Sequence, residues 1–407
     1  MMSRRQYLAA NAGLAVAMPL MARADVPGAA FPARRDFAPT DIAYLDNGSQ
    51  HPISLGARAA VDAYFAKRTL DPAAQGYELD EQGVIAQFAR LINAEPGEVT
   101  YVQSTTAGEQ MVLRALGLPR DGAHIVTDTL HFFGSLPLYE EMAKQGCEVT
   151  WLRPVDGRIR IEDMKAAVRK GTQLVALSLV STVNGFEHDL KAVCDIAHAA
   201  GALVYADIVH AAGCVPIDVK ASGVDFAASS TYKWLMGDFG LGFLYVRGDL
   251  LPRLRRSNYG YYGIGSFQTH IYPFDTPGDT IADYSFRPDA AGAFALGTHS
   301  HAVIAQLGHS LGYIARLGVP AIQAHVQTMI AVLKAELPRR GYSVMTPPEA
   351  RTPIVAVALK DARAKLSAPM KAAKVRLTLS ANRFRLTPSV QNDMTDIERF
   401  LAALPRA

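Results

Sequence analysis

The stretch Ala202-Leu-Val-Tyr-Ala-Asp-Ile-Val-His210, followed by Asp225-Phe-Ala-Ala-Ser-Ser-Thr-Tyr-Lys233, decides the fold. Each part begins with a short apolar run and ends in polar residues. Apolar runs of this length predict strands that are covered on both faces of a sheet. Because ligands bind beyond the carboxyl ends of strands in such sheets, the stretch predicts a site that contains Asp207 and Lys233.

The same pattern extends on both sides of this stretch. Further apolar runs predict strands at residues 124–128, 148–152, 173–180 and 242–246. Amphipathic periodicity predicts helices at residues 110–116, 136–144, 161–169, 190–200, 301–317 and 320–337. This alternation predicts an α/β fold with a mostly parallel central sheet. An aromatic and glycine-rich segment at 248–297 interrupts the alternation, and a long loop of this kind is usually functional or mobile. A short α/β segment at 352–404 closes the chain.

The composition is that of a globular protein large enough for two domains. Of the 407 residues, 49% are hydrophobic and 19% are charged. The net charge of +3 is small for this length and gives no basis for nucleic-acid binding. Cys147, Cys194 and Cys214 show no metal-ligand spacing, and an odd number argues against a disulfide framework. We expect buried thiols, although one bridge remains an alternative.

Residues 1–24 have the order of a cleaved export signal. Arg4 and Arg5 precede a weakly hydrophobic, alanine-rich stretch, and Ala22-Arg-Ala24 supplies small residues for cleavage. The adjacent arginines are similar to a twin-arginine signal, which exports folded proteins. We therefore expect a periplasmic protein without a membrane anchor.

Lys233 and Asp207 have the surroundings that a pyridoxal phosphate site requires. This cofactor needs a lysine for its aldehyde, an acid for its pyridine nitrogen, a phosphate site and a stacking group. Lys233 follows an apolar strand between Tyr232 and Trp234, where partial desolvation would lower the pKa of its amine. Asp207 closes an apolar strand, where a carboxylate needs a partner. The alternatives are a solvated lysine and a helix-capping aspartate.

A helix N-terminus rich in hydroxyl groups suits the phosphate. Gln103-Ser-Thr-Thr-Ala-Gly-Glu109 precedes the helical run at 110–116. Free amides and hydroxyls at such a terminus bind anions. An ordinary Ser/Thr cap completed by Glu109 explains the segment equally well.

Together these segments resemble the class V aminotransferases, a family of fold-type I pyridoxal-phosphate enzymes, from about Tyr44 to Phe400. The segments are Tyr44-Leu-Asp-Asn-Gly-Ser49, Ser104-Thr-Thr-Ala-Gly108, His131-Phe-Phe-Gly-Ser135, Ser178–Gly185, Asp207-Ile-Val-His210, Ser230-Thr-Tyr-Lys233, Ala295-Leu-Gly-Thr298 and Arg385-Leu-Thr-Pro-Ser389. The resemblance implies a large cofactor-binding domain at residues 46–290. Residues 25–45 and 291–407 would form a smaller α/β domain.

The resemblance also implies roles for individual residues. Lys233 would hold the cofactor as a Schiff base, Asp207 would pair with its ring nitrogen, and His210 would contact its phenolic oxygen. Phe133 would stack on the ring, with His131 as the alternative. The phosphate would be bound by Thr105, Thr106 and Tyr232, and by Thr298 from the partner subunit of a homodimer. Thr182 and Ser230 would also contact the cofactor. Asn47 and Arg385 would bind the substrate, with Arg385 on its carboxylate.

Three residues depart from the family pattern, and they bear on the substrate rather than on the cofactor. Leu179 replaces a histidine, Thr182 stands at an asparagine position, and Tyr232 replaces the usual histidine phosphate ligand.

The expected reaction lies at the α-carbon of an amino acid or amine. Transamination is the first expectation, and epimerisation or racemisation and C–S or C–N cleavage are the alternatives. A desulfurase needs a reactive cysteine in the C-terminal domain, and no cysteine follows Cys214. A periplasmic binding protein would explain the sheet but not Asp207 beside Lys233. A nucleotide-binding oxidoreductase would rest on the glycine run 237–242, which precedes a strand rather than a helix.

Overall fold

The computed structural model describes residues 31–70, 79–256 and 258–406, and residues 31–407 form one compact unit. The expected export signal therefore lies outside the described residues. Among the described residues, no helix is long and apolar enough to span a membrane.

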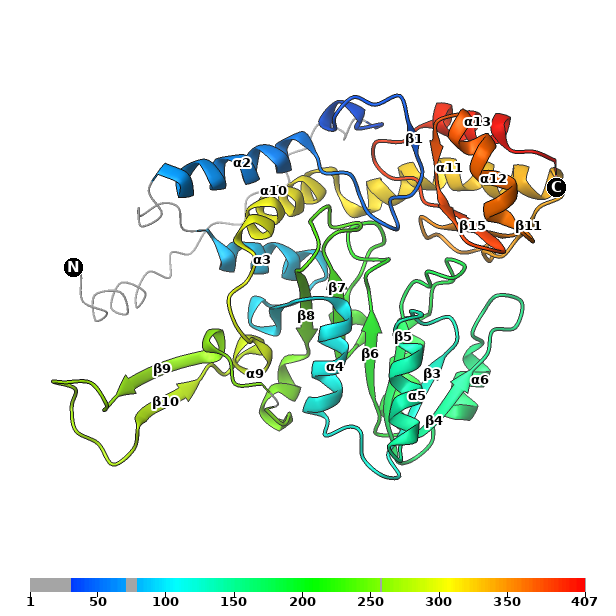
Figure 1. The fold of residues 1–407 in the computed structure, drawn as a ribbon. Helices are drawn as coiled ribbons and strands as arrows, with labels where there is room; N and C mark the ends of the chain where they lie inside the picture. The colour runs from blue at the N-terminus through cyan, green and yellow to red at the C-terminus, as the bar shows by residue number, and fades with distance from the viewer. Residues whose placement is uncertain (1–30, 71–78, 257, 407) are drawn as a thin grey trace. The chain divides into compact units, whose positions relative to one another are not determined.

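The centre of this unit is a seven-stranded sheet (Figure 1). Its strands, in spatial order, are β2 (Val99–Val102), β8 (Gly242–Val246), β7 (Phe226–Ser230), β6 (Leu203–Asp207), β5 (Thr172–Ser178), β3 (His124–Asp128) and β4 (Glu148–Leu152). From β7 to β4 all neighbours are parallel, whereas β8 is antiparallel to both β7 and β2. The predicted α/β fold with a mostly parallel sheet is confirmed.

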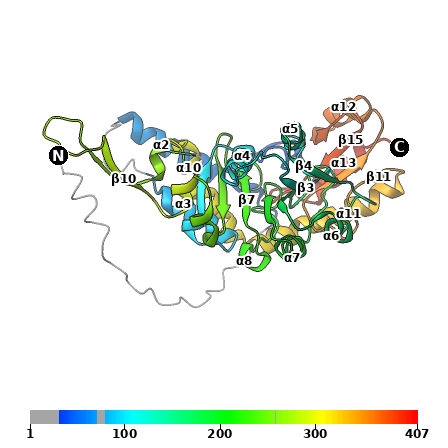
Figure 2. The same ribbon diagram turned by 90° about the horizontal axis from the view of Figure 1, so that it is seen from below.

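Helices cover both faces of this sheet (Figure 2). Val175 and Leu177 of β5 pack into a core shared with α6 (Ile161–Ala167) and α7 (Leu190–Ala199). Leu174 and Ala176 of the same strand pack on the opposite face, against α4 (Thr105–Ala115) and α5 (Leu136–Lys144). Because alternate side chains of a strand point to opposite faces, a strand covered twice must be apolar throughout.

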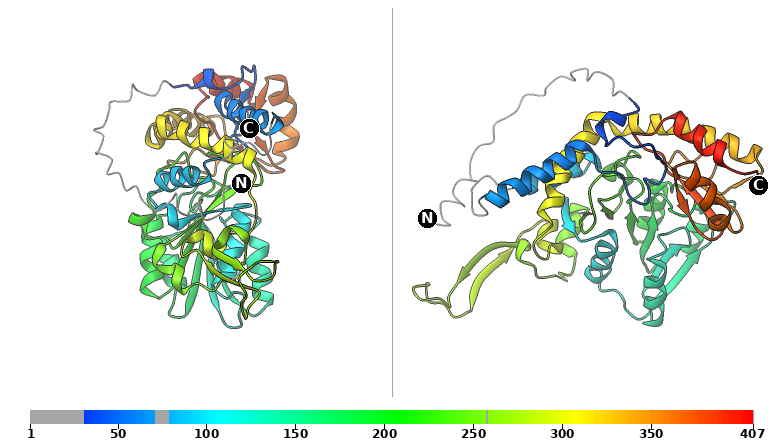
Figure 3. Two further views of the ribbon diagram at one scale, coloured as in Figure 1. Left: turned by 90° about the vertical axis from the view of Figure 1, so that its left-hand side faces the viewer. Right: turned by 45° about the horizontal axis from the view of Figure 1, so that its top comes forward.

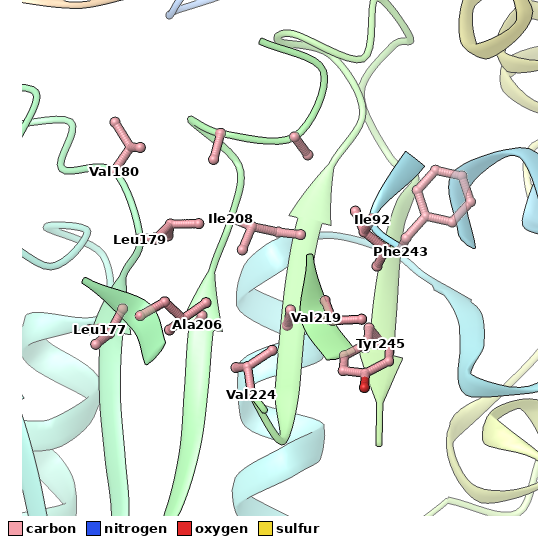
Figure 4. Close-up of a cluster of buried hydrophobic side chains, with 14 of the residues drawn as sticks. Ile92, Leu177, Leu179, Val180, Ala206, Ile208, Val219, Val224, Phe243 and Tyr245 are labelled. Atoms are coloured by element: carbon pink, nitrogen blue, oxygen red, sulfur yellow. The ribbon is translucent and has the colours of Figure 1, made fainter. Parts of the chain in front are cut away.

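The first of these cores continues across the sheet to β8. Figure 4 shows Leu177, Ala206, Phe243 and Tyr245 side chains reaching it from three strands. Phe243 stacks on Phe88 of α3 (Glu81–Leu91), with ring centroids 4.1 Å apart. At the start of β8, a Cβ on Gly242 would lie 2.7 Å from the Ser229 carbonyl oxygen. Only glycine allows the two antiparallel strands to approach this closely.

A second core holds the C-terminal part of the chain. Its elements are β1 (Ala43–Tyr44), α11 (Val319–Arg339), β11 (Ser343–Val344), β12 (Val355–Ala358), α12 (Ala362–Ala372), β13 (Val375–Arg376), β14 (Thr378–Leu379), β15 (Arg383–Leu386) and α13 (Met394–Ala403). Four of these strands form the antiparallel sheet β11-β12-β15-β14, and β1 pairs in parallel with β13. Helix α10 (His301–Leu317) follows the predicted boundary at residues 290 and 291, yet it packs in the first core, beside α2 (Leu55–Leu70). The division into two domains at this boundary stays a prediction.

The segment expected to be irregular contains a β-hairpin. Strands β9 (Ile264–Thr269) and β10 (Ala282–Phe286) pair in antiparallel fashion and extend away from the neighbouring α9 (Ala290–Phe294) in Figures 1 and 3. Most residues of both strands are exposed. A strand with neither face buried gives no alternation of apolar and polar residues, so the pattern did not predict it.

Candidate active site

Three neighbouring parallel strands bring the predicted chemical groups together. Ser178 ends β5, Asp207 ends β6 and Ser230 ends β7, and Ser178 is aligned with Asp207 in the sheet. Lys233 lies in the turn after β7 and is 7% exposed, while Asp207 is 3% exposed. The two charges affect each other's pKa, so the structure places Asp207 and Lys233 in one buried site.

Lys233 is a buried amine without a carboxylate partner. Its Nζ is 3.1 Å from Nε2 of His210, and it forms no ion pair among the described residues. Burial lowers the pKa of Lys233 to about 8, Asp207 opposes this shift, and Arg385 adds to it. A lysine of this kind supplies far more neutral, nucleophilic amine near neutral pH than a solvated one. The alternative of a solvated surface lysine is wrong.

Asp207 is a buried carboxylate at the same strand end. Its Oδ1 accepts a hydrogen bond from the amide of Val209 at 2.9 Å. Burial raises its pKa, whereas His131, this hydrogen bond and Lys233 lower it. The residues that follow Asp207 form turns rather than a helix, so the helix-cap alternative is not supported. Its position suits a cationic ring nitrogen, which would stabilise the carboxylate.

The predicted phosphate segment opens α4 at the end of the sheet. Ser104 caps the helix by accepting from the amide of Ala107 at 3.1 Å. The amide of Thr105 donates to Oγ of Ser230 at 3.0 Å, and the amide of Ser230 donates to Oγ1 of Thr105 at 2.8 Å. The cap uses the amide of Ala107 and Ser230 uses that of Thr105, so the amide of Thr106 remains in this first turn for an anion to bind.

Glu109 does not complete that cap, because its carboxylate serves a buried network. It accepts from Nε2 of His131 at 3.0 Å, from Oγ of Ser135 at 2.6 Å and from the hydroxyl of Tyr139 at 2.7 Å. Burial disfavours both charges, but their mutual attraction outweighs it, so the pKa of Glu109 is lowered and that of His131 is raised. Nδ1 of His131 lies 2.8 Å from Oγ of Ser178.

The structure reverses the predicted order of the stacking residues. Phe133 is 70% exposed and its ring packs on Phe132, whereas His131 is fully buried. His131 is also close enough to Asp207 for each charge to shift the other's pKa. Phe133 is therefore misplaced for a ring held at Asp207, and the burial of His131 near Asp207 favours the alternative stacking residue.

Arg385 of β15 is a buried guanidinium held by hydroxyl groups. Its Nη1 donates to the hydroxyl of Thr182, and its Nη2 donates to Oγ of Ser49 at 3.0 Å and to Oγ1 of Thr378 at 3.2 Å. Its Nε is buried without a hydrogen-bond partner among the described residues. Burial lowers the pKa of Arg385 to about 10, so it stays charged at neutral pH. A buried cation with a free donor suits a carboxylate ligand.

Thr182, predicted to contact the cofactor, therefore lies with Arg385, the residue predicted to bind the substrate. Ser49 and Thr378 join the same group, although sequence reasoning had not assigned them a role.

Three predicted residues have surroundings that the sequence did not predict. The amide of Asn47 donates to the Thr387 carbonyl at 2.8 Å and to Oδ1 of Asn392 at 3.1 Å, so it joins chain segments instead of facing a ligand. The ring of Tyr232 stacks on Phe239, with centroids 4.3 Å apart. Thr298 is exposed and lines a hollow of about 390 Å³ beside α2, away from Thr105 and Ser230.

The donor set at the strand ends fits pyridoxal phosphate. Lys233 supplies a buried amine without an ion-pair partner, and Asp207 supplies a carboxylate for the ring nitrogen. His131 supplies a buried ring, and the first turn of α4 supplies amides and hydroxyls for a phosphate. These are the four groups that the cofactor requires, and one edge of the sheet provides all of them. No group of three or more potential metal ligands occurs among the described residues.

Comparisons with known proteins agree with this geometry. The chain matches the model of the aminotransferase class V family over residues 81–373. It is 28% identical to a probable cysteine desulfurase of Methanothermobacter thermautotrophicus, over 72% of each chain. It is 29% identical to the uncharacterized aminotransferase YcbU of Bacillus subtilis, over 75% of this chain and 78% of that protein. Among solved structures, a cysteine desulfurase from Thermococcus onnurineus NA1 shares the fold, with a TM-score of 0.78, 22% identity and coverage of 92% of this chain and 97% of that one.

Proposed function

This chain belongs to the class V aminotransferase family and is a pyridoxal-phosphate enzyme, and from that premise we propose that it cleaves a C–S bond in an amino acid with sulfur on its β-carbon. The main support is the buried Lys233, which has no ion-pair partner among the described residues and whose pKa is influenced by both Asp207 and Arg385. The name of the desulfurase relative supports C–S cleavage over the transamination that the sequence put first.

The cysteines of the chain argue for elimination rather than desulfuration. A desulfurase passes sulfur to a reactive thiolate of its own, which must be accessible and have a low pKa. Here Cys147, Cys194 and Cys214 are all free and buried. Burial raises the pKa of Cys194 to about 12 and that of Cys214 well above its usual value. We therefore expect the sulfur to leave as part of the released product and not to be transferred to a cysteine of the enzyme.

Substrate binding and proton removal each have a residue in place. When bound, the cofactor withdraws electrons from the α-carbon and so acidifies its proton. Arg385 holds the substrate carboxylate, and Lys233 accepts the α-proton on Nζ. The C–S bond then breaks, and the sulfur leaves with the bonding electron pair. Water hydrolyses the remaining three-carbon fragment to a 2-oxo acid and ammonia.

The test is the fate of nitrogen and sulfur after incubation with L-cystine or L-cysteine. Elimination from L-cysteine would release ammonia, a 2-oxo acid and sulfide in equal amounts, whereas L-cystine would give ammonia, a 2-oxo acid and cysteine persulfide. Transamination is the second candidate, favoured by the 29% identity to an aminotransferase. It would move the amino group to a second 2-oxo acid without free ammonia. An inverted but otherwise intact substrate would instead indicate an epimerase. Either of these outcomes contradicts C–S cleavage.

Arg385→Lys is expected to raise KM about 10- to 100-fold with a smaller effect on kcat. A lysine keeps the charge but loses the planar pair of donors, and the hydroxyls of Ser49 and Thr182 lose their partner. The measurement is steady-state kinetics with whichever of L-cystine and L-cysteine is turned over. Arg363→Lys, at an exposed arginine of α12, is the control. An unchanged KM would remove Arg385 from substrate binding.

We also propose that residues 1–24 export the folded chain to the periplasm and that it acts as a homodimer. The position of Thr298, exposed and away from its own phosphate residues, supports a contact with the partner's cofactor. Cell fractionation and light scattering test the two proposals. A monomer that binds pyridoxal phosphate tightly would contradict the role of Thr298.

A further inference from the structure

His210 lies between two side chains from the turn after β7. Its Nε2 is 3.1 Å from Nζ of Lys233, and its Nδ1 is 3.4 Å from Nε1 of Trp234. All three residues are buried. An indole N–H group can only donate a hydrogen bond. Nδ1 of His210 is therefore the acceptor in this contact, and it carries no proton.

The remaining proton of His210 must then be on Nε2. Burial lowers the pKa of His210 well below its usual value, so the ring is neutral and carries one proton. With Nδ1 bare, this proton points from Nε2 to Nζ of Lys233. The contact is a hydrogen bond only if the amine accepts, and an amine accepts only in its neutral form.

We propose that Trp234 is a positioning residue that keeps Lys233 neutral by fixing the tautomer of His210. The proposal depends on the proposed function only in taking Lys233 as the cofactor-binding lysine. A neutral amine is the form that bonds to an aldehyde carbon, with release of one water. Charging Lys233 would require the proton of His210 to move to Nδ1, where it would face the indole N–H of Trp234. Protonation of Lys233 therefore costs one hydrogen bond.

Burial lowers the pKa of Lys233 to about 8, which leaves the amine only partly neutral near neutral pH. Asp207 of β6 favours the charged form, and the ring of Tyr232, whose centroid is 5.6 Å from Nζ, also attracts a cation. Burial disfavours the charged form most, and Arg385 of β15 adds to this effect. These influences oppose one another, and we expect the tautomer of His210 to add a preference for the neutral amine.

Trp234→Phe tests this directly, because it keeps a buried aromatic ring and removes only the N–H donor. Full-length protein freed of cofactor is mixed with pyridoxal phosphate at a series of pH values. Borohydride then fixes the bound cofactor, and peptide mass spectrometry measures the label on Lys233. Labelling of the unaltered protein should rise through a midpoint near pH 8. In Trp234→Phe the midpoint should move upward by about 0.7 pH unit, the effect of one hydrogen bond, so labelling below the midpoint slows about fivefold.

Two control comparisons distinguish an effect on the tautomer of His210 from a general effect of changed packing. Trp151→Phe, at the other tryptophan of the chain, should leave the midpoint unchanged. In a His210→Phe background, Trp234→Phe should cause no further shift. A midpoint unchanged by Trp234→Phe alone, or an equal shift in both backgrounds, would overturn the proposal.

Nitrogen NMR of His210 in the unaltered, cofactor-free protein shows which ring nitrogen carries the proton. This measurement needs no variant, so it does not depend on whether a variant folds. A proton on Nε2 is expected, and a proton on Nδ1 would overturn the proposal. Label on another lysine would instead contradict the role of Lys233 in the proposed function.

Discussion

Lys233→Ala is expected to abolish covalent attachment of pyridoxal phosphate and to lower turnover by at least about 10²–10⁴-fold, the range for loss of a general base. Lys233 is expected to bind the cofactor and to move the α-proton, and the described part of the site holds no second lysine at a strand end. The phosphate segment and Asp207 remain, so the variant should still bind the cofactor without a covalent bond.

The measurement combines turnover with mass spectrometry after borohydride reduction. Lys191→Ala, at an exposed lysine of α7 paired with Asp195, is the matched control and should keep both label and activity. Covalent label in Lys233→Ala, on any residue, would refute the assignment of the cofactor lysine.

Glu109→Ala is expected to lower the free energy of unfolding by about 3–5 kcal/mol, the usual cost of removing one partner of a buried ion pair. The change leaves His131 charged without its partner, and it removes the acceptor of the Ser135 and Tyr139 hydroxyls. Urea unfolding monitored by circular dichroism gives the difference. Glu141→Ala, at an exposed glutamate paired with Lys144, should change stability by less than about 0.5 kcal/mol.

The same comparison has a defined pH dependence. The pKa of Glu109 is lowered in the folded state, so its contribution is present above its ordinary value of 4.5 and is lost as the pH falls. The pKa of His131 is raised, so its contribution is complete below 6.5 and is lost as the pH rises through the folded value. The difference between Glu109→Ala and the unaltered protein should be largest between pH 4.5 and 6.5. A difference independent of pH would mean that the pair is not ionised.

The large domain was predictable because its strands are covered on both faces. The predicted bounds of β3, α5, β4, β8 and α10 agree with the structure at both ends. Strand ends in a parallel sheet meet at one edge, so the presence of Asp207 and Lys233 in one site could be predicted from their order along the chain. The hairpin β9–β10 was missed because it buries neither face.

Side-chain direction, by contrast, could not be predicted from order along the chain. Phe133 and His131 are two residues apart, and only the fold shows that one is exposed and the other buried. Glu109 carried a signal that was overlooked, since a carboxylate on the apolar side of a helix requires buried partners. The use of Asn47 as a link to Thr387 depends on contacts between the two ends of the chain, which no local pattern contains.

The pairing of β1 with β13 has a consequence for the order of assembly. Ala43 aligns with Val375, and Arg385 meets Ser49 across a comparable stretch of chain. Contacts between such distant residues carry a large loop-closure entropy and form late in folding. The groups with which a chain is expected to hold its own cofactor lie between Thr105 and Lys233, so a ribosome completes them well before Arg385. During synthesis, this enzyme can therefore acquire the parts that bind its cofactor while it is still unable to hold a substrate.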